Sequence, residues 1–283
     1  MAGGQKEARR LTPAPRPADW WRHAHDPSAI ARRVAALAMR HGLRRKTLVR
    51  LGQDRVEVLH SPASAAGRPR VYLSAGVHGD EPAAVEGLLR WLEGKPRLGR
   101  FDVTIVPCIN PGGLRLNTRT DPQGRDLNRA FNRRPAPVIA ALKRLMAARG
   151  PFALGLFLHE DYDGCGVYLY EIARPGARWG PALLAAAAPF CPPDPRRDID
   201  GRPARDGVVQ VDIDSPRLKA MFRRIGMAEA PYLYFAGTPR ACTIETPSEF
   251  DLAVRAEAHR AALTAALDLL AEEAQKSPPE GGA

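Results

Sequence analysis

Short apolar runs alternate with helix-type patterns through most of the chain. Several of these runs are apolar almost throughout, which is typical of strands covered on both faces of a sheet. They predict strands at residues 55–60, 70–77, 102–107, 152–159, 167–172, 208–213, 232–235 and 241–246.

The segments between these runs have the apolar spacing of amphipathic helices. Four of them open with Pro, which is tolerated in the first turn of a helix. The pattern predicts helices at residues 28–40, 82–93, 137–148, 181–189, 216–225 and 249–273. Alternating strands and helices favour an α/β sandwich, in which sites form where strands end and loops begin. The polar motifs of this chain lie at those places.

The two ends of the chain differ from its middle in composition. Residues 1–25 are rich in Pro, Arg and Gly, so we expect a flexible basic arm there, and residues 275–283 form a similar flexible tail. Residues 26–274 then form one folded domain. The N-terminal segment lacks an apolar stretch of about 7–15 residues, so no secretory signal is expected. No run of about 18 apolar residues predicts a membrane span, and a cytoplasmic location follows by default.

The composition is that of an ordinary globular protein, since 45% of the 283 residues are hydrophobic and 26% are charged. The formal net charge of +11 could indicate a nucleic acid, a membrane surface or an acidic substrate as partner. The basic residues are spread from Arg9 to Arg260, however, and no zinc-finger spacing accompanies them. We therefore expect a solvated, arginine-rich surface and no nucleic-acid partner. The four cysteines form no CxxC pair, which argues against a thiolate metal site.

The first segment with candidate chemistry is a strand that runs into His78 and Glu81, with a helix beginning at Pro82. A turn between strand and helix can bring two side chains three residues apart onto one point. An imidazole nitrogen and a carboxylate oxygen suit zinc. Taken alone, His78 could equally be a helix-start residue, and Glu81 a favourable acid in a first helical turn.

The second segment is another strongly apolar strand that ends in His159. Two histidines and one carboxylate, with a fourth position open for water, form a common catalytic zinc set. The helical HExxH motif is absent from the sequence. A histidine at a strand end can also be a satisfied core residue, as His60 illustrates.

The third segment, residues 118–131, gathers three arginines, an asparagine and two aspartates in an expected loop. Arginine forks bind carboxylates with two parallel hydrogen bonds, and Asn adds a directional donor. Such a cluster would suit a substrate with a free carboxylate. The alternative is a set of solvated loop charges.

The fourth segment is an apolar strand that Glu245 interrupts. A buried carboxylate without a partner is costly, so it needs a partner or a role. General base to a water on a metal ion is a natural role. Pairing with one of the many arginines is the structural alternative.

Together the four segments resemble the zinc carboxypeptidase family, which includes the carboxypeptidase A and B enzymes. The family pattern is HxxE, then an Arg upstream of an Asn–Arg pair, then a His, then a Glu. Here it reads His78-Gly-Asp-Glu81, Arg119, Asn128-Arg129, His159 and Glu245, in the family's order. The resemblance spans about residues 70–250. It implies a single-domain α/β fold with a mixed, mostly parallel central sheet flanked by helices.

The resemblance also implies a metal centre. His78, Glu81 and His159 would hold one zinc ion per chain. Asp126 would orient His78 from outside the ligand set.

The same resemblance implies roles for four further residues. Arg119 would stabilise the oxyanion that forms at the scissile carbonyl. Asn128 and Arg129 would grip the terminal carboxylate of the substrate. Glu245 would take a proton from the attacking water and pass it to the leaving amine.

Two features depart from the family pattern. The tyrosine that caps the substrate has no clear counterpart, because Tyr232 and Tyr234 resemble alternating strand positions. No residue stands out as the determinant of side-chain preference. Glu229 and Asp214 could attract a basic side chain, or they could lie on a solvated face. The acidic run at residues 160–171 resembles a subgroup of small bacterial carboxypeptidase-like proteins.

The sequence therefore predicts a zinc metallocarboxypeptidase that releases the C-terminal residue of small peptides, with cell-wall peptides as one option. The alternative is an N-acyl amino-acid amidohydrolase that resembles aspartoacylase and succinylglutamate desuccinylase. These relatives share much of the ligand and Arg pattern and also need a carboxylate clamp. A third hypothesis is a non-catalytic binding module, against which the intact Glu245 and ligand set argue.

Overall fold

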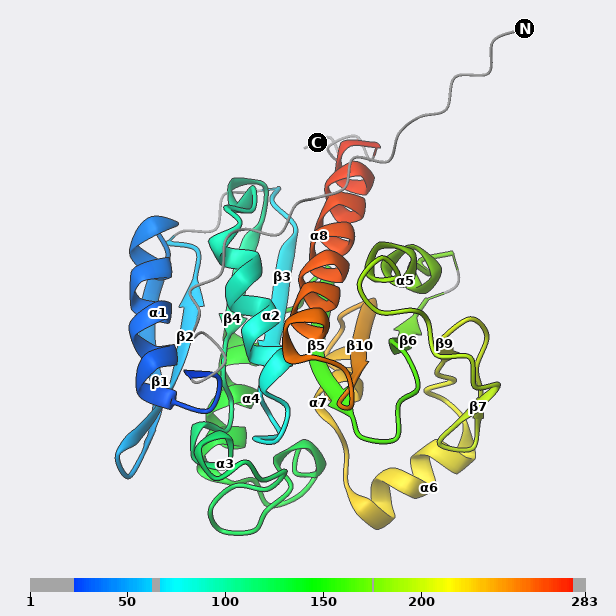
Figure 1. Ribbon diagram of the computed structural model, residues 1–283, viewed down its shortest axis with the longest axis horizontal. Helices are drawn as coiled ribbons and strands as arrows, with labels where there is room; N and C mark the ends of the chain where they lie inside the picture. The colour runs from blue at the N-terminus through cyan, green and yellow to red at the C-terminus, as the bar shows by residue number, and fades with distance from the viewer. Residues whose placement is uncertain (1–22, 63–66, 175, 277–283) are drawn as a thin grey trace, which may run out of the picture.

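The computed structural model describes residues 23–62, 67–174 and 176–276. Most of the predicted N-terminal arm and most of the predicted tail lie outside these residues. Within them, a central sheet separates two layers of helices (Figure 1).

The central sheet has eight strands in the order β1-β2-β4-β3-β5-β10-β6-β9. Strands β4, β3, β5 and β10 are mutually parallel, whereas β1, β2 and β6 add antiparallel pairings, and β9 runs parallel to β6. The strands are β1 Arg44–Leu51, β2 Asp54–His60, β3 Arg70–Ala75, β4 Asp102–Val106, β5 Leu154–Asp161, β6 Tyr168–Ala173, β9 Val208–Gln210 and β10 Arg240–Pro247. The prediction of an α/β fold with a mixed, mostly parallel sheet is confirmed.

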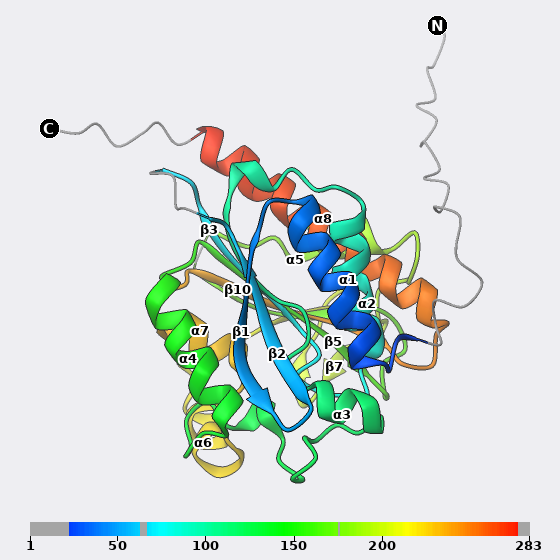
Figure 2. The ribbon, with the colours of Figure 1, turned by 90° about the vertical axis from the view of Figure 1, so that its left-hand side faces the viewer.

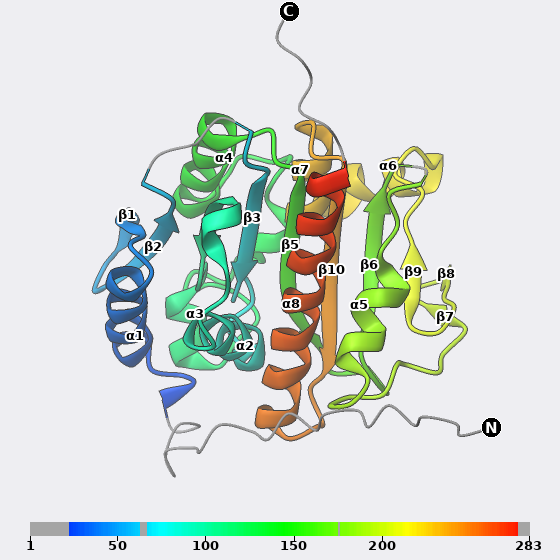
Figure 3. The same ribbon diagram turned by 90° about the horizontal axis from the view of Figure 1, so that it is seen from above.

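One face of the sheet is covered by α1 Pro27–Arg40, α2 Pro82–Glu93, α5 Gly180–Ala187 and α8 Leu252–Lys276. The opposite face is covered by α4 Pro137–Arg149, α6 Pro216–Ile225 and α7 Glu229–Phe235. Figure 2 shows the two layers from the side, and Figure 3 shows them along the sheet from above. Each layer buries its own apolar core against the sheet.

Short elements complete the fold. They are the helix α3 Pro111–Leu116, the 3-10 turns η2 Leu98–Arg100 and η3 Leu127–Arg129, and the two-stranded hairpin of β7 Asp198–Ile199 and β8 Arg202–Pro203. The hairpin turns at Asp200 and Gly201, which both have positive φ, as a tight two-residue hairpin turn requires.

The predicted strand at 232–235 is wrong, because these residues belong to the helix α7. Pro231 is the third residue of that helix, where a missing N–H costs nothing. Ala230 and Leu233 are both buried and lie three residues apart, which is helical spacing. The alternating tyrosines Tyr232 and Tyr234 resemble a strand only when this proline is overlooked.

The predicted strand at 208–213 is also too long, since β9 ends at Gln210. The pattern missed β1, whose residues are largely exposed and rich in Arg and Lys. Charged residues are common on edge strands, where they discourage pairing with another chain. An apolar pattern therefore could not reveal β1.

Candidate active site

The three predicted metal ligands converge at the C-terminal edge of the parallel strands. His78 lies in the loop after β3, Glu81 lies directly before α2, and His159 lies on β5. The Nδ1 atom of His78 is 2.5 Å from Oε1 of Glu81, and the Nδ1 atom of His159 is 2.9 Å from Oε2 of the same carboxylate. One ligand atom from each residue lies within 4.8 Å of the others, and all three residues are buried.

The donor set fits a zinc ion. Two imidazole nitrogens and one carboxylate oxygen are a common catalytic zinc set, and a fourth position stays open. Oε2 of Glu81 is buried and has no hydrogen bond of good geometry, although His159 lies close to it. The side chains of Glu81 and His159 therefore lie close together without a well-formed hydrogen bond between them, as ligands of one ion would. The structure brings together the three residues that the sequence suggested as ligands. Their role as ligands is a proposal.

His78 and Glu81 each shift the pKa of the other. Burial would lower the pKa of His78, but the carboxylates of Glu81 and Asp126 raise that pKa to about 9. Burial would raise the pKa of Glu81, but His78 and His159 lower it to about 2. Glu81 is thus an anion in the folded protein, ready to neutralise part of a cation's charge.

Asp126 lies behind His78, as the sequence predicted. Its Oδ1 atom is 3.4 Å from Nε2 of His78, and it also accepts a hydrogen bond from the Asn128 N–H at the start of η3. Arg119 donates from Nε to Oδ2 of Asp126 over 3.1 Å. Such an outer carboxylate fixes the orientation of a ligand histidine.

Arg119, Asn128 and Arg129 line the same cavity as the histidines. Oδ1 of Asn128 accepts a hydrogen bond of 2.9 Å from the buried Glu229 N–H. The amide oxygen is therefore occupied, which leaves the amide NH₂ of Asn128 for another partner. The loop thus offers two guanidinium groups and one amide donor to an anionic ligand.

Glu245 lies on β10, with one residue of each neighbouring strand beside it. In the sheet register it pairs with His159 of β5 on one side and with Tyr168 of β6 on the other. Burial raises the pKa of Glu245 to about 8, while His159 opposes this shift and Glu81 adds to it. A cation held by the histidines would lower that pKa again, because it favours the ionised carboxylate.

The cavity around these groups has a volume of about 410 Å³. Besides the predicted residues, it is lined by tyrosines of β6, the turn of the β7–β8 hairpin and the apolar face of α6. The pattern Val167-Tyr-Leu-Tyr placed Tyr168 and Tyr170 on one face of a strand. Only the register with β10 reveals that this face is the one with Glu245.

Two acids in this wall hold the tyrosines. The Tyr168 hydroxyl donates to Asp161 over 3.0 Å, and the Tyr170 hydroxyl donates to Asp200 over 2.6 Å. Arg202 lies 5.8 Å from the centre of the Tyr170 ring. Asp161 belongs to the acidic run that follows His159 in the sequence, whereas Asp200 and Arg202 were not predicted as part of the site.

The residues suggested for substrate capping or side-chain preference lie elsewhere. Tyr232 packs against Phe131, with ring centres 5.4 Å apart, and neither it nor Tyr234 lines the cavity. Asp214 is exposed and pairs with Lys219. Glu229 is buried outside the cavity, where its carboxylate accepts hydrogen bonds from Tyr72 and Ser74.

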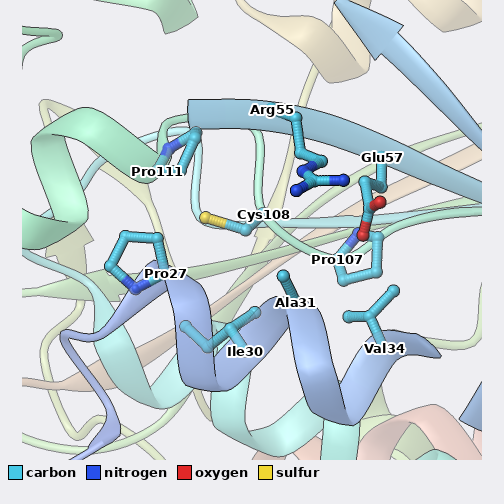
Figure 4. Close-up of a pocket in the computed structure, with 9 residues that line it drawn as sticks. All are labelled: Pro27, Ile30, Ala31, Val34, Arg55, Glu57, Pro107, Cys108 and Pro111. Atoms are coloured by element: carbon cyan, nitrogen blue, oxygen red, sulfur yellow. The ribbon is translucent and has the colours of Figure 1, made fainter. Parts of the chain in front are cut away.

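A second hollow lies between α1 and β2, around Cys108 (Figure 4). Its volume is about 20 Å³, which is room for about one water molecule. Burial raises the pKa of the Cys108 thiol to about 12, so this sulfur stays protonated and is a poor nucleophile. Of these two hollows, the cavity around the histidines and Glu245 is therefore the better candidate for chemistry.

Parts of the chain are similar to known proteins. Residues 67–176 match the family model of the succinylglutamate desuccinylase/aspartoacylase catalytic domain. A segment of 73 residues is 44% identical to murein peptide amidase A of Escherichia coli K12 and covers 25% of this chain and 28% of that amidase. A second alignment, over 134 residues, shows 33% identity to carboxypeptidase D of Anas platyrhynchos and covers 33% of this chain but 10% of that protein.

The fold has close counterparts among solved structures. A candidate metallopeptidase from Shewanella amazonensis superposes with a TM-score of 0.76 at 25% identity, over 87% of this chain and 94% of that one. The chain is thus similar in fold to a metallopeptidase over most of its length. A metallo-carboxypeptidase from Burkholderia cenocepacia shares the fold, with a TM-score of 0.61 at 18% identity, over 86% of this chain and 68% of that one. None of the helices in the described part of the chain has both the length and the apolar character that a membrane span needs.

Proposed function

We propose that this protein is a zinc-dependent metallocarboxypeptidase that hydrolyses the C-terminal amide bond of small peptides. The observation that carries the proposal is the position of Glu245. It lies next to a candidate ligand histidine, in a cavity that also holds two arginines and an asparagine suited to a carboxylate. A base beside a metal centre and an anion clamp in the same cavity are the parts that this reaction needs.

His78, Glu81 and His159 would hold the zinc ion. Bound zinc supplies Lewis acidity, which lowers the pKa of water and polarises a carbonyl oxygen. Asn128 and Arg129 bind the terminal carboxylate and so align the scissile amide. Glu245 accepts the proton of the attacking water and returns it to the leaving amine, while Arg119 donates to the developing oxyanion.

The N-acyl amino-acid amidohydrolase is the second candidate, and the match to the desuccinylase/aspartoacylase domain favours it. Both reactions break an amide bond beside a free carboxylate, so the same clamp serves either substrate. A panel of dipeptides, murein-derived peptides and N-acyl amino acids, assayed with zinc-loaded protein, separates the two. Murein-derived peptides belong in the panel because the aligned Escherichia coli relative is a murein peptide amidase.

Arg129→Ala tests the carboxylate clamp. We expect a large rise in KM for a substrate with a free C-terminal carboxylate, because an interaction present in both ground and transition states acts on binding. Amidation of the substrate's C-terminus removes the same contact. Amidation should therefore lower kcat/KM much less for the variant than for the wild type. The measurement is kcat/KM for wild type and variant with the acid and amide forms of one peptide. Losses that simply add would mean that Arg129 does not bind the carboxylate.

Nucleic-acid binding by a non-catalytic module is the third alternative. It predicts that DNA affinity falls steeply as the salt concentration rises and does not depend on zinc. Zinc-dependent hydrolysis without such affinity would exclude it.

A further inference from the structure

The apolar wall of the cavity comes from one face of α6. Leu218, Met221, Phe222 and Ile225 line the cavity at the spacing i, i+3, i+4 and i+7. Only Leu218 and Phe222 are buried, and Ile225 is 36% exposed. Burial of α6 therefore only partly fixes the position of the apolar face that a substrate side chain would contact.

The end of α6 is bound instead to the loop that carries Asn128 and Arg129. The side chain of Asn132 donates from Nδ2 to the Phe222 carbonyl over 3.0 Å, and its Oδ1 accepts from the Met227 N–H over 2.7 Å. The Phe222 carbonyl lies in the last turn of α6 and also accepts from the Gly226 N–H, and Met227 follows the helix, so Asn132 ties the C-terminal end of α6 to a distant part of the chain. The Phe131 N–H adds a backbone hydrogen bond to the Met227 carbonyl over 3.2 Å.

Gly226 lets the two segments touch. Its φ of 99° and ψ of 167° fall in a region that is essentially restricted to glycine. A Cβ atom at this position would lie 1.9 Å from the Arg129 carbonyl oxygen. The chain after α6 thus passes directly against the backbone of the residue proposed to bind the substrate carboxylate.

The loop is the fixed partner in this contact. Phe131 is fully buried, and its carbonyl accepts a hydrogen bond from Lys143 of α4. Most residues of α6 are exposed by comparison. Weakening the contact should therefore release α6 and leave Asn128 and Arg129 in place.

On the basis of the proposed function, we propose that Asn132 and Gly226 are positioning residues that fix the side-chain wall of α6 to the carboxylate-binding loop. The pocket for the released side chain is then set at a constant distance from the clamp for the carboxylate. Selectivity for the size of the released residue depends on this contact, whereas the catalytic step does not.

Asn132→Ala tests the proposal, and the exposure of Asn132 favours normal folding of the variant. For substrates that release Phe, we expect KM to rise about fivefold, from the loss of two partly solvated hydrogen bonds. For substrates that release Ala, KM should change less than about twofold, since Ala does not reach the wall, and kcat should hold for both. Arg134→Ala, a truncation of an exposed residue in the same loop, is the control and should leave the Phe-to-Ala preference unchanged. An unchanged preference in Asn132→Ala would overturn the proposal, as would an equal loss for both substrates.

Hydrogen exchange tests the same contact without catalysis. In the zinc-loaded Asn132→Ala protein, the amides of residues 219–227 should exchange faster than in wild type, with the rest of the chain unchanged. N-acetylphenylalanine, which carries both a carboxylate and an apolar side chain, should slow this exchange in wild type and much less in the variant. Equal exchange in wild type and variant would overturn the proposal, and so would failure of the probe to act on wild type. If wild type hydrolyses no substrate but the exchange results appear as expected, the proposed function fails while the positioning role stands.

Gly226→Ala is the harsher variant. The added methyl group must displace either Arg129 or α6, so the selectivity change should exceed that of Asn132→Ala. If the Gly226→Ala protein folds and keeps the wild-type selectivity, the close contact between Gly226 and the Arg129 backbone does not position α6.

Discussion

In the proposed mechanism Glu245 and the candidate ligands act on different parts of the reaction, so substitutions of the two should have different effects on zinc binding and turnover. Glu245→Gln keeps the shape of the side chain but removes its basicity. We expect zinc to stay bound at about one ion per chain, while kcat falls by several orders of magnitude. Metal analysis beside a turnover assay measures both quantities.

His159→Ala is the matched variant for that experiment. It removes one of the two proposed nitrogen ligands and would leave too few protein ligands for tight zinc binding. Zinc and activity should be lost together in this variant and on chelation of the wild type. Full zinc occupancy in His159→Ala would place the metal elsewhere, and near-normal turnover in Glu245→Gln would move the base to another residue.

Glu229 should make stability depend on pH. Burial raises its pKa from 4.5 to about 7, although hydrogen bonds from Tyr72 and Ser74 oppose the shift. The folded state therefore binds a proton more tightly than the unfolded state. This contribution to stability is fully present below pH 4.5 and is lost as pH rises through about 7, by at most on the order of 3 kcal/mol.

Urea unfolding at about pH 5 and about pH 8 measures this loss. In Glu229→Gln the side chain cannot ionise, so the fall in unfolding free energy between the two pH values should be smaller than in wild type. Glu249→Gln makes the same chemical change at an exposed position and should follow wild type. Parallel pH curves for wild type and Glu229→Gln would contradict the prediction.

The sequence revealed the residues of the site better than its walls. His78, Glu81, His159 and Glu245 stand out because a polar group within an apolar strand, or in the turn directly after one, needs an explanation. Tyr168 has no such signal, because a tyrosine on a half-buried strand is ordinary. Its place beside Glu245 comes from the register between β6 and β10, which depends on long-range pairing.

At the scale of elements, the loop after β3 packs against α3 without space for a side chain at Gly79. A Cβ atom there would lie 2.0 Å from the carbonyl carbon of Gly113 and 2.2 Å from the Leu114 nitrogen. Because both are backbone atoms of α3, the clash cannot be relieved by a rotamer change. The loop carries His78 and Glu81, so its displacement should also disturb the metal site.

Gly79→Ala should therefore lower the unfolding free energy by about 3 kcal/mol or more and weaken zinc binding. Gly99→Ala is the control, because nothing lies within 4 Å of a Cβ atom at that position. It should change the unfolding free energy by less than about 0.5 kcal/mol. Urea unfolding and zinc titration of the two variants test this, and equal stability of the two would refute the packing argument.

Element types followed from the sequence where one pattern dominated. The boundaries of α2 and α6 agree with the prediction, since each begins with Pro and has clear helical spacing. The helix α7 was mistaken for a strand because its seven residues are too few to show a helical period against alternating tyrosines. The β7–β8 hairpin was missed because strands of two residues have no period at all.

At the scale of the whole molecule, the net charge of +11 should attract anionic substrates. Long-range attraction raises the association rate and is screened by salt. We expect kcat/KM for a peptide with two carboxylates to fall several-fold between about 0.05 M and about 0.5 M salt, more than for a peptide with one. A peptide with an added Lys should show the opposite trend, and a common salt response for all three would remove the steering argument.

The row formed by His159, Glu245 and Tyr168 across three adjacent strands has a consequence for how such a protein can change over generations. The proposed base occupies one point in this row, and neither the loop of His78 and Glu81 nor the loop of Asn128 and Arg129 contributes a residue to it. A single codon change at that point would turn a cleaving enzyme into a receptor that still captures its ligand in a zinc-dependent manner. Loss of turnover and retention of recognition are thus one mutational step apart in this architecture.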